Sequence, residues 1–370
     1  MKHLFLLLTF LSFPIINQAS TPDLTLLVGT YTGNGSVGIY TFRFNPEDLT
    51  INPLSQVAID NPSYLTVSPD TKYVYAVSES GGNSTVNAFA FDKSEGTLRL
   101  LNRKQVGSGP CYVTFHAPTH SVATANYNEG SVSIVKVAAD GSLGDRQISF
   151  QYEGQGINPS RQTKPHVHCI IESPDKKAFF ATDLGTDKIH KIEITVSQNE
   201  TKDLTTVFTK STPVDLEPGS GPRHLIFNKK GSHAYLINEL SGMATVFSVD
   251  AGNQLKQIQS VLADTVNAGG SADIRLSPDE RFLYTSTRLK GDGIVIFKVN
   301  DDGTIKRTGY QATGIHPRNF AITPDGNRML VACQNSNLIM IFNIDKQTGL
   351  LTDSGKTISV SRPVCIKFVQ

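Results

Sequence analysis

The chain has 370 residues, and the apolar set AVILMFWYC makes up 39% of it, which is enough for a sizeable core. Its 34 lysines and arginines nearly balance 33 aspartates and glutamates, which excludes the basic surplus of a general nucleic-acid binder and the charge excess of a disordered polyelectrolyte. Thirty glycines, 18 prolines and no tryptophan suit many short strands and turns, and length alone allows two or three domains.

The N-terminus has the layout of a secretory signal peptide. Lys2 and His3 give a basic start, residues 4–16 are mostly apolar, and Ala19 or Ser20 offers a small residue at the cleavage point. The apolar run is short for a membrane span, although an uncleaved anchor is the alternative. We therefore expect residues 1–19 to be removed and the remainder to be exported, periplasmic or secreted, without stable membrane insertion.

One phrase recurs from residue 24 onward: a turn of the Ser-Pro-Asp type, an apolar strand and a polar cluster. Equivalent positions in the apolar strand, 47 to 57 residues apart, are Leu27, Tyr75, Ala123, Phe180, Tyr235, Tyr284 and Val331. Further strand-like runs follow in each copy, and no long helical periodicity occurs. Four short strands per unit are typical of a propeller blade, so the seven copies predict an all-β, seven-bladed β-propeller over residues 20–370. Two β-sandwiches are the minor alternative.

The two ends of the chain are predicted to complete one blade together. Each turn is preceded by another strand, and its copies start at Pro62, Pro110, Pro165, Pro222, Ser271 and Pro317. The last copy, residues 363–368, has no strands after it, whereas the strand from Leu24 has none before it. Pairing these two ends closes the ring and leaves no open sheet edge.

Polar residues are predicted to converge on one rim of the ring, because the innermost strand starts where its antiparallel neighbour ends. Aligned on the following turn, the inner strands place Ser63, Tyr112, His168, Arg223, Ala272 and Arg318 there, with Cys111 and His166 as competing choices. The second strands place Tyr31, Glu79, Tyr127, Leu184, Glu239, Arg288 and Asn335 there. Charges of both signs at one mouth predict a chemical site, and ion pairs that plug the channel are the alternative.

The residue types at this rim suggest a reaction. Arginine binds carboxylate or phosphate bidentately and stabilises a developing oxyanion, and histidine or glutamate can take a proton from water. We expect Glu239 or His168 to be the base that activates water. Arg223 and Arg288 would bind the anion and the oxyanion. Further substrate contacts are expected from Arg318, Glu79, Tyr127 and His166.

Other motifs are weaker. His166 and His168 could hold a metal, but no third ligand has a fixed spacing to them, so we expect neither a metal nor another cofactor. The four cysteines, Cys111, Cys169, Cys333 and Cys365, lack CxxC spacing and are expected to be buried thiols, with one disulfide as the alternative. Residues 183–187 are expected to form a turn. No role is evident for five further histidines: His116, His120, His190, His233 and His316.

The combined motifs resemble those of the seven-bladed β-propeller lactonase family, which includes bacterial 6-phosphogluconolactonase and a fungal carboxymuconate-lactonising enzyme. The resemblance covers residues 24–369, through the segments 27–32, 61–65, 125–127, 161–162, 165–168, 183–187, 219–224, 238–240 and 317–318. It implies a metal-independent site at one end of the channel. The family's proposed His, Arg, Glu and Arg match His168, Arg223, Glu239 and Arg288. Family members often have Ser-Asn-Arg where this chain has Ser286-Thr287-Arg288.

Three functions follow as hypotheses. The first is hydrolysis of a sugar or sugar-phosphate lactone, with a small anionic lactone or carboxylate as the only partner and a monomer as the expected state. The second is a cycloisomerase acting on a muconate-type dicarboxylate, whose two carboxylates two arginines would suit. The third is a non-enzymatic binding propeller of the cell envelope, since this fold supports many functions.

Overall fold

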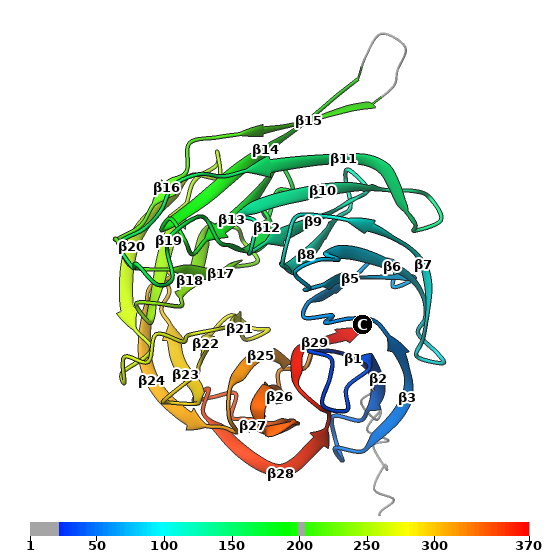
Figure 1. The fold of residues 1–370 in the computed structure, drawn as a ribbon. Coiled ribbons are helices and arrows are strands. Elements are labelled where there is room, and N and C mark those ends of the chain that lie inside the picture. The colour runs from blue at the N-terminus through cyan, green and yellow to red at the C-terminus, as the bar shows by residue number, and fades with distance from the viewer. Residues whose placement is uncertain (1–21, 199–203, 370) are drawn as a thin grey trace, which may run out of the picture.

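The computed structural model describes residues 22–198 and 204–369 (Figure 1). The strands of this part form seven antiparallel sheets arranged as blades around a central axis. This confirms the predicted seven-bladed propeller, and the alternative of two sandwiches is wrong. The predicted signal peptide lies outside the described residues. No helix within the described ranges is long and apolar enough to span a membrane.

Six blades follow chain order, with the first strand of each innermost. The first two are β4 (Leu65–Val67), β5 (Tyr73–Ser78), β6 (Thr85–Asp92) and β7 (Thr97–Gln105), and then β8 (Pro110–His116), β9 (Ser121–Asn126), β10 (Ser131–Val137) and β11 (Leu143–Gln151). The next two are β12 (Val167–Glu172), β13 (Ala178–Asp183), β14 (Lys188–Gln198) and β15 (Leu204–Lys210), with the short β16 (Val214–Asp215) beside β14, and then β17 (Pro222–Phe227), β18 (His233–Asn238), β19 (Met243–Val249) and β20 (Leu255–Leu262). The last two are β21 (Ile274–Leu276), β22 (Phe282–Thr287), β23 (Gly293–Val299) and β24 (Ile305–Ala312), and then β25 (Pro317–Ile322), β26 (Arg328–Cys333), the 3-10 turn η1 (Gln334–Ser336), β27 (Leu338–Ile344) and β28 (Leu351–Ser359).

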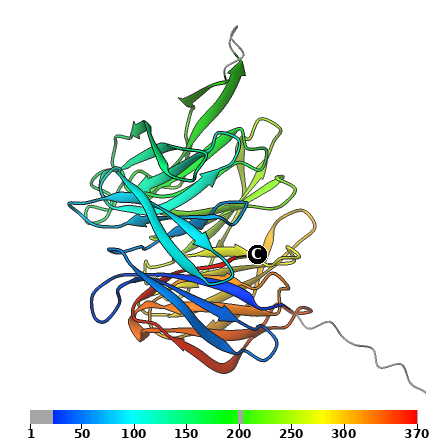
Figure 2. The ribbon, with the colours of Figure 1, turned by 90° about the vertical axis from the view of Figure 1, so that its right-hand side faces the viewer.

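The seventh blade contains both ends of the described chain. It consists of β29 (Pro363–Val369), β1 (Leu24–Thr30), β2 (Gly38–Phe44) and β3 (Ile51–Ala58). β29 pairs antiparallel with β1, with Leu26 opposite Phe368, and the red and blue strands lie together in Figure 1. The predicted ring closure is confirmed. Figures 1 and 2 also show the β14–β15 hairpin projecting beyond the ring.

The recurring Ser-Pro-Asp phrase is explained by local hydrogen bonds. In the turn before β5, the Ser68 hydroxyl donates to Asp70 Oδ1 (2.6 Å) and accepts from the Tyr73 backbone N–H (3.0 Å). The turns before β13, β22 and β26 repeat the first of these bonds, from Ser173, Ser277 and Thr323. Because a short polar side chain forms hydrogen bonds with the turn's own backbone, the turn forms without contacts from distant residues.

Buried tyrosines tie neighbouring blades together. The hydroxyls of Tyr75, Tyr235 and Tyr284 donate to the carbonyls of Gly141, Gly303 and Gly349, at 3.0, 3.0 and 2.9 Å. Each of these glycines has a positive φ of 74° to 82°, a conformation that favours glycine. The tyrosines therefore fill the space between blades with apolar rings and still satisfy their hydroxyl groups.

The four cysteines, Cys111, Cys169, Cys333 and Cys365, are free and buried, as predicted.

Candidate active site

A β-bulge places the predicted rim residues of the inner strands. The pairing of β8, β12, β17 and β25 with their neighbours skips one residue, directly after the first residue of the pairing. The skipped residues are Cys111, His168, Arg223 and Arg318. A bulge leaves one residue out of the ladder and redirects its side chain. The alternative prediction, Cys111, therefore occupies the rim position, and Tyr112 does not. The Tyr112 ring instead stacks on the Tyr64 ring, with 3.9 Å between the ring centroids.

On the second strand of each blade, the rim position is the residue that directly follows the strand. The backbone N–H groups of Glu79, Tyr127 and Glu239 donate to carbonyl oxygens of the segment that leads into the inner strand of the same blade. The accepting residue in each case directly precedes a proline: Asn61, Gly109 and Gly221. In the β25–β28 blade the same bond starts from Gln334, not from Asn335. The predicted alignment was one residue out there, because the apolar run of β26 allowed either choice.

Glu239 is the centre of a cluster of arginines. Its Oε2 accepts a hydrogen bond from Arg223 Nε (2.8 Å) and lies 3.2 Å from Arg288 Nη2, and its Oε1 accepts from Arg161 Nη2 (2.7 Å). The Glu239 side chain is only 8% exposed. Burial alone would raise the pKa of this carboxyl, but Arg288, Arg223 and Arg161 outweigh it and lower the pKa to about 2. Glu239 is therefore a fully ionised carboxylate that three guanidiniums share.

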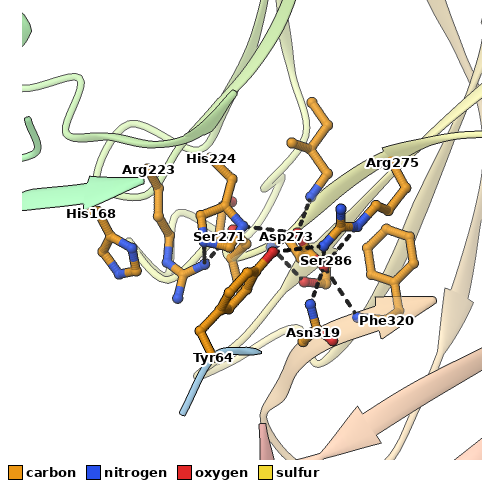
Figure 3. Close-up of polar contacts among 12 residues, drawn as sticks. Tyr64, His168, Arg223, His224, Ser271, Asp273, Arg275, Ser286, Asn319 and Phe320 are labelled. Atoms are coloured by element: carbon orange, nitrogen blue, oxygen red, sulfur yellow. Dashed lines mark hydrogen bonds and ion pairs between the residues drawn. The ribbon is translucent and has the colours of Figure 1, made fainter. Parts of the chain in front are cut away.

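Arg223 is held on a second side by a buried histidine and aspartate (Figure 3). Its Nη1 donates to the Ala272 carbonyl (2.6 Å) and lies 3.2 Å from His224 Nε2. His224 Nδ1 lies 2.8 Å from Asp273 Oδ1. Since a guanidinium only donates, His224 Nε2 accepts and its proton is assigned to Nδ1. Arg223 Nη2 has no hydrogen-bond partner in the described part of the chain and remains free to bind a ligand.

Asp273 anchors this arrangement across three blades. Besides His224 of β17, its carboxylate accepts from Arg275 of β21 (3.2 Å) and from Asn319 Nδ2 of β25 (2.6 Å). Burial opposes ionisation of Asp273, but Arg275 and His224 prevail and hold the pKa of this carboxyl well below its usual range. Asp273 was not predicted from the sequence, because two of its partners, His224 and Asn319, lie on other blades.

Asp187 likewise holds two loops in place: the loop before β17, which contains Gly219 and Gly221, and the loop that contains Gln162. Its Oδ1 accepts from Gly221 N (2.7 Å) and from Gln162 Nε2 (2.8 Å), and its Oδ2 accepts from Gly219 N (2.7 Å). The first loop leads into β17 and Arg223, and the second, residues 152–166, carries Arg161. The turn predicted at residues 183–187 thus also aligns two of the arginines. The long 152–166 connection explains the largest spacing between repeats.

His168 is buried beside Arg223 (Figure 3). Its Nδ1 lies 3.8 Å from Cys111 Sγ, and its Nε2 has no hydrogen-bond partner among the described residues. Burial, Arg223 and His224 lower the pKa of His168 well below its usual value, so the ring is neutral. The neighbouring His166 lies before β12 and stacks on Tyr127 at 4.4 Å, with Nδ1 2.9 Å from the Tyr127 carbonyl oxygen.

A further arginine of the mouth, Arg318, has no ion-pair partner among the described residues. Arg318 lies over the Tyr31 ring at 5.3 Å, and the Tyr31 hydroxyl donates to Glu79 Oε2 (2.9 Å). No hydrogen bond or ion pair involves the Arg318 guanidinium in the part of the chain that the structure describes. At the equivalent position of the β4–β7 blade, the buried Ser63 hydroxyl also lacks a partner. The half-buried Arg318 guanidinium is available to a ligand, whereas the Ser63 hydroxyl is enclosed by the protein.

The structure brings all eight predicted site residues to this mouth, and adds others. Arg161 was not predicted as a site residue because it lies on a loop outside the repeat. The dipeptide Arg161-Gln162 was nevertheless one of the motifs that resemble the family. His316 was missed because its neighbour in space, Arg288, is on another blade. In residues 22–198 and 204–369, no three His, Cys, Asp or Glu side chains are grouped so that they could hold a metal ion.

Thr287 stands where family members often have asparagine, and a local hydrogen bond of Thr287 takes the place of the asparagine's hydrogen bonds. In the β17–β20 blade the equivalent Asn238 donates to the Met243 carbonyl (3.0 Å) and to Thr245 Oγ1 (3.0 Å). In this blade the Thr287 hydroxyl donates instead to the Gly291 carbonyl across the turn. The backbone before Arg288 is therefore still tied down.

The fold and the site define the class of protein: a closed seven-bladed propeller with arginines and a histidine at one mouth. Residues 25–368 match the family model described as "Lactonase, 7-bladed beta-propeller". The chain therefore belongs to the seven-bladed β-propeller lactonase family.

Individual relatives agree with this. A 6-phosphogluconolactonase from Formosa agariphila is 37% identical over 336 residues, which cover 88% of this chain and 94% of that protein. The crystal structure of a candidate 6-phosphogluconolactonase from Bacteroides fragilis has a TM-score of 0.89 and 50% identity, and covers 94% of this chain and 98% of that one. The periplasmic gluconolactonase PpgL of Pseudomonas aeruginosa has a TM-score of 0.85 and 32% identity, over 94% and 99%.

Proposed function

We propose that this protein hydrolyses a sugar lactone that carries an anionic group, at the mouth lined by Arg223, Arg288 and His168. One observation carries the proposal: Arg223 is locked by Glu239 and His224 while its Nη2 stays free, next to a neutral histidine with a free Nε2. A rigid donor beside a free acceptor is what attack of water on a carbonyl requires. Lactone hydrolysis also agrees with the relatives named above.

In the proposed reaction, His168 Nε2 takes a proton from water as the water oxygen attacks the lactone carbonyl. Arg223 Nη2 donates to the oxyanion that develops on the carbonyl oxygen. The C–O bond of the ring then breaks, and the proton passes from His168 to the leaving oxygen to give the hydroxy acid. Glu239, the other predicted base, suits this role less, because three arginines occupy both of its oxygens, whereas His168 Nε2 has no partner among the described residues.

Arg318 is proposed to bind the anionic group of the substrate. Its guanidinium has no acceptor among the described residues, and unpaired donors suit a carboxylate or phosphate from outside. The mouth also has more arginines than carboxylates: Arg161, Arg223, Arg288 and Arg318 face Glu239 and Glu79. This excess of positive charge favours an anionic substrate over a neutral one.

The N-terminal pattern supports export, so we propose that the substrate is met outside the cytoplasm. The periplasmic location named for the Pseudomonas aeruginosa gluconolactonase supports this as well.

The test is hydrolysis of gluconolactone and of its 6-phosphate, corrected for the spontaneous reaction. We expect Arg318→Met to raise KM for the phosphorylated lactone roughly 10- to 100-fold, because it removes a charge-assisted hydrogen bond, and to change KM for the neutral lactone little. Arg223→Ala should reduce kcat on both substrates.

Arg146→Met is the matched control, since Arg146 is exposed on the outer strand β11. No rate above the blank on either lactone would remove the proposed function. An equal effect of Arg318→Met on both substrates would remove only the anion-binding role.

A further inference from the structure

His316 has a backbone conformation that is uncommon for a residue other than glycine. It precedes the first residue of β25, and its φ is 64°, in the left-handed region. The same place in other blades is taken by Asn61, Gly109, Gly221 and Arg362, all with positive φ. Glycine and asparagine adopt this conformation more easily than histidine does. The two glycines show that the ring tolerates a residue without a side chain at this place.

Neighbouring groups hold His316 in this conformation. Its backbone N–H donates to Asp292 Oδ1 (2.8 Å), and its carbonyl accepts from Gln334 N (3.1 Å). The preceding residue, Ile315, donates its N–H to Ser336 Oγ (2.7 Å). A strained residue persists only where its surroundings over-determine it, and such residues concentrate at functional sites.

The side chain that this conformation presents contacts an arginine of the mouth. His316 Nε2 lies 3.2 Å from Arg288 Nη1. The guanidinium carries only donors, so Nε2 accepts and the ring proton is assigned to Nδ1. Burial, Arg288, Arg318 and Arg223 lower the pKa of His316 to about 3, and Glu239 offsets this only in part, so the ring is neutral at physiological pH.

The contact completes the set of acceptors around Arg288. Nε of Arg288 donates to the Gly270 carbonyl (2.7 Å), and Nη2 faces the Ser271 carbonyl (3.4 Å) and Glu239 Oε2 (3.2 Å). For Nη1, the imidazole of His316 is the only acceptor among the described residues. Without it, the guanidinium would be held on one edge and could turn away from Glu239.

We propose that His316 is a positioning residue of the active site, which uses its strained backbone to hold Arg288 through a neutral Nε2. This inference rests on the proposed function, in which Arg288 lines the mouth where the lactone binds. It explains why a histidine occupies a place where glycine would be easier for the backbone.

The experiment compares three substitutions of His316. The substitutions that suit the backbone are expected to lower kcat, and the one that keeps kcat is expected not to raise Tm. Gly and Asn suit the left-handed conformation but place no acceptor where Nε2 lies, whereas the Gln side chain can place Oε1 there. We expect His316→Gly and His316→Asn to have a Tm at or above that of the parent and a kcat roughly 10- to 100-fold lower, with KM changed less. His316→Gln should keep most of kcat with a Tm no higher than the parent's.

His120→Gly is the matched control, because His120 also has a positive φ of 42° but lies in the turn between β8 and β9. It should behave like His316→Gly in stability and keep full activity. Parental kcat in His316→Gly, or loss of kcat in His316→Gln as large as in His316→Asn, would overturn the proposal.

Nitrogen NMR of the imidazole separates this proposal from the proposed function. We expect the His316 ring to stay neutral, with a proton on Nδ1 and none on Nε2, from pH 8 down to pH 5. A protonated Nε2 in that range would overturn the contact with Arg288 whatever the activity. A parent enzyme without lactonase activity but with the expected nitrogen signals would refute the proposed function and with it His316's catalytic purpose, while the contact would stand.

Discussion

Asp273→Ala is expected to lower the free energy of unfolding by about 3–5 kcal/mol, the usual cost of removing one partner from a buried ionic network. The substitution leaves Arg275, whose side chain is 25% exposed, without its carboxylate, and deprives His224 and Asn319 of their acceptor. Because these partners come from three neighbouring blades, the loss loosens the ring where Arg223 enters the site. Denaturant unfolding measures the change.

Asp273→Asn should cost less than Asp273→Ala, because the amide oxygen still accepts one of these hydrogen bonds. Asp301→Ala is the control, since Asp301 is an exposed aspartate in the turn between β23 and β24. Equal stabilities of the Asp273 and Asp301 variants would refute the role assigned to Asp273.

Glu239→Gln is expected to reduce kcat/KM at least about 100-fold, because the arginines that face the substrate lose the charge that holds them. The variant also tests stability against pH. The pKa of Glu239 falls from an ordinary 4.5 to about 2 in the folded protein, so the carboxylate stabilises the fold above pH 4.5, and this contribution is lost as pH falls toward 2. The shift corresponds to about 3 kcal/mol.

Other carboxylates titrate in the same range, so the measurement is the difference between parent and variant. We expect the stability advantage of the parent over Glu239→Gln to shrink by about 3 kcal/mol between pH 4.5 and pH 2. Glu217→Gln, which alters an exposed carboxylate, should show no such change. A parent and a Glu239→Gln variant that lose stability in parallel would contradict the ionised, shared carboxylate described here.

The prediction from sequence was most successful where the information is local. The turn before β5 encloses its own hydrogen bonds between Ser68, Asp70 and Tyr73, so the same phrase marks the same turn in most blades. Strand spacing then determines the number of blades, and unpaired strands at the two ends identify the closing pair.

The sequence pattern does not determine the alignment where one residue more or less in a strand changes which side chain faces the rim. Cys111 and Tyr112 were both possible, and Gln334 was confused with Asn335. The bulge in β8 decides the first choice, and bulges depend on how an inner strand meets its neighbours around the axis.

By itself, the sequence determined an all-β ring of seven repeats, its closure, and the rim at which charged residues gather. Only the tertiary structure decided which residues cooperate there. Arg161 reaches Glu239 from 78 positions away, Asp273 reaches His224 from 49, and His316 reaches Arg288 from 28. The physical reason is that burial and turn formation follow local patterns in the chain, whereas these contacts exist only after separate blades have packed side by side.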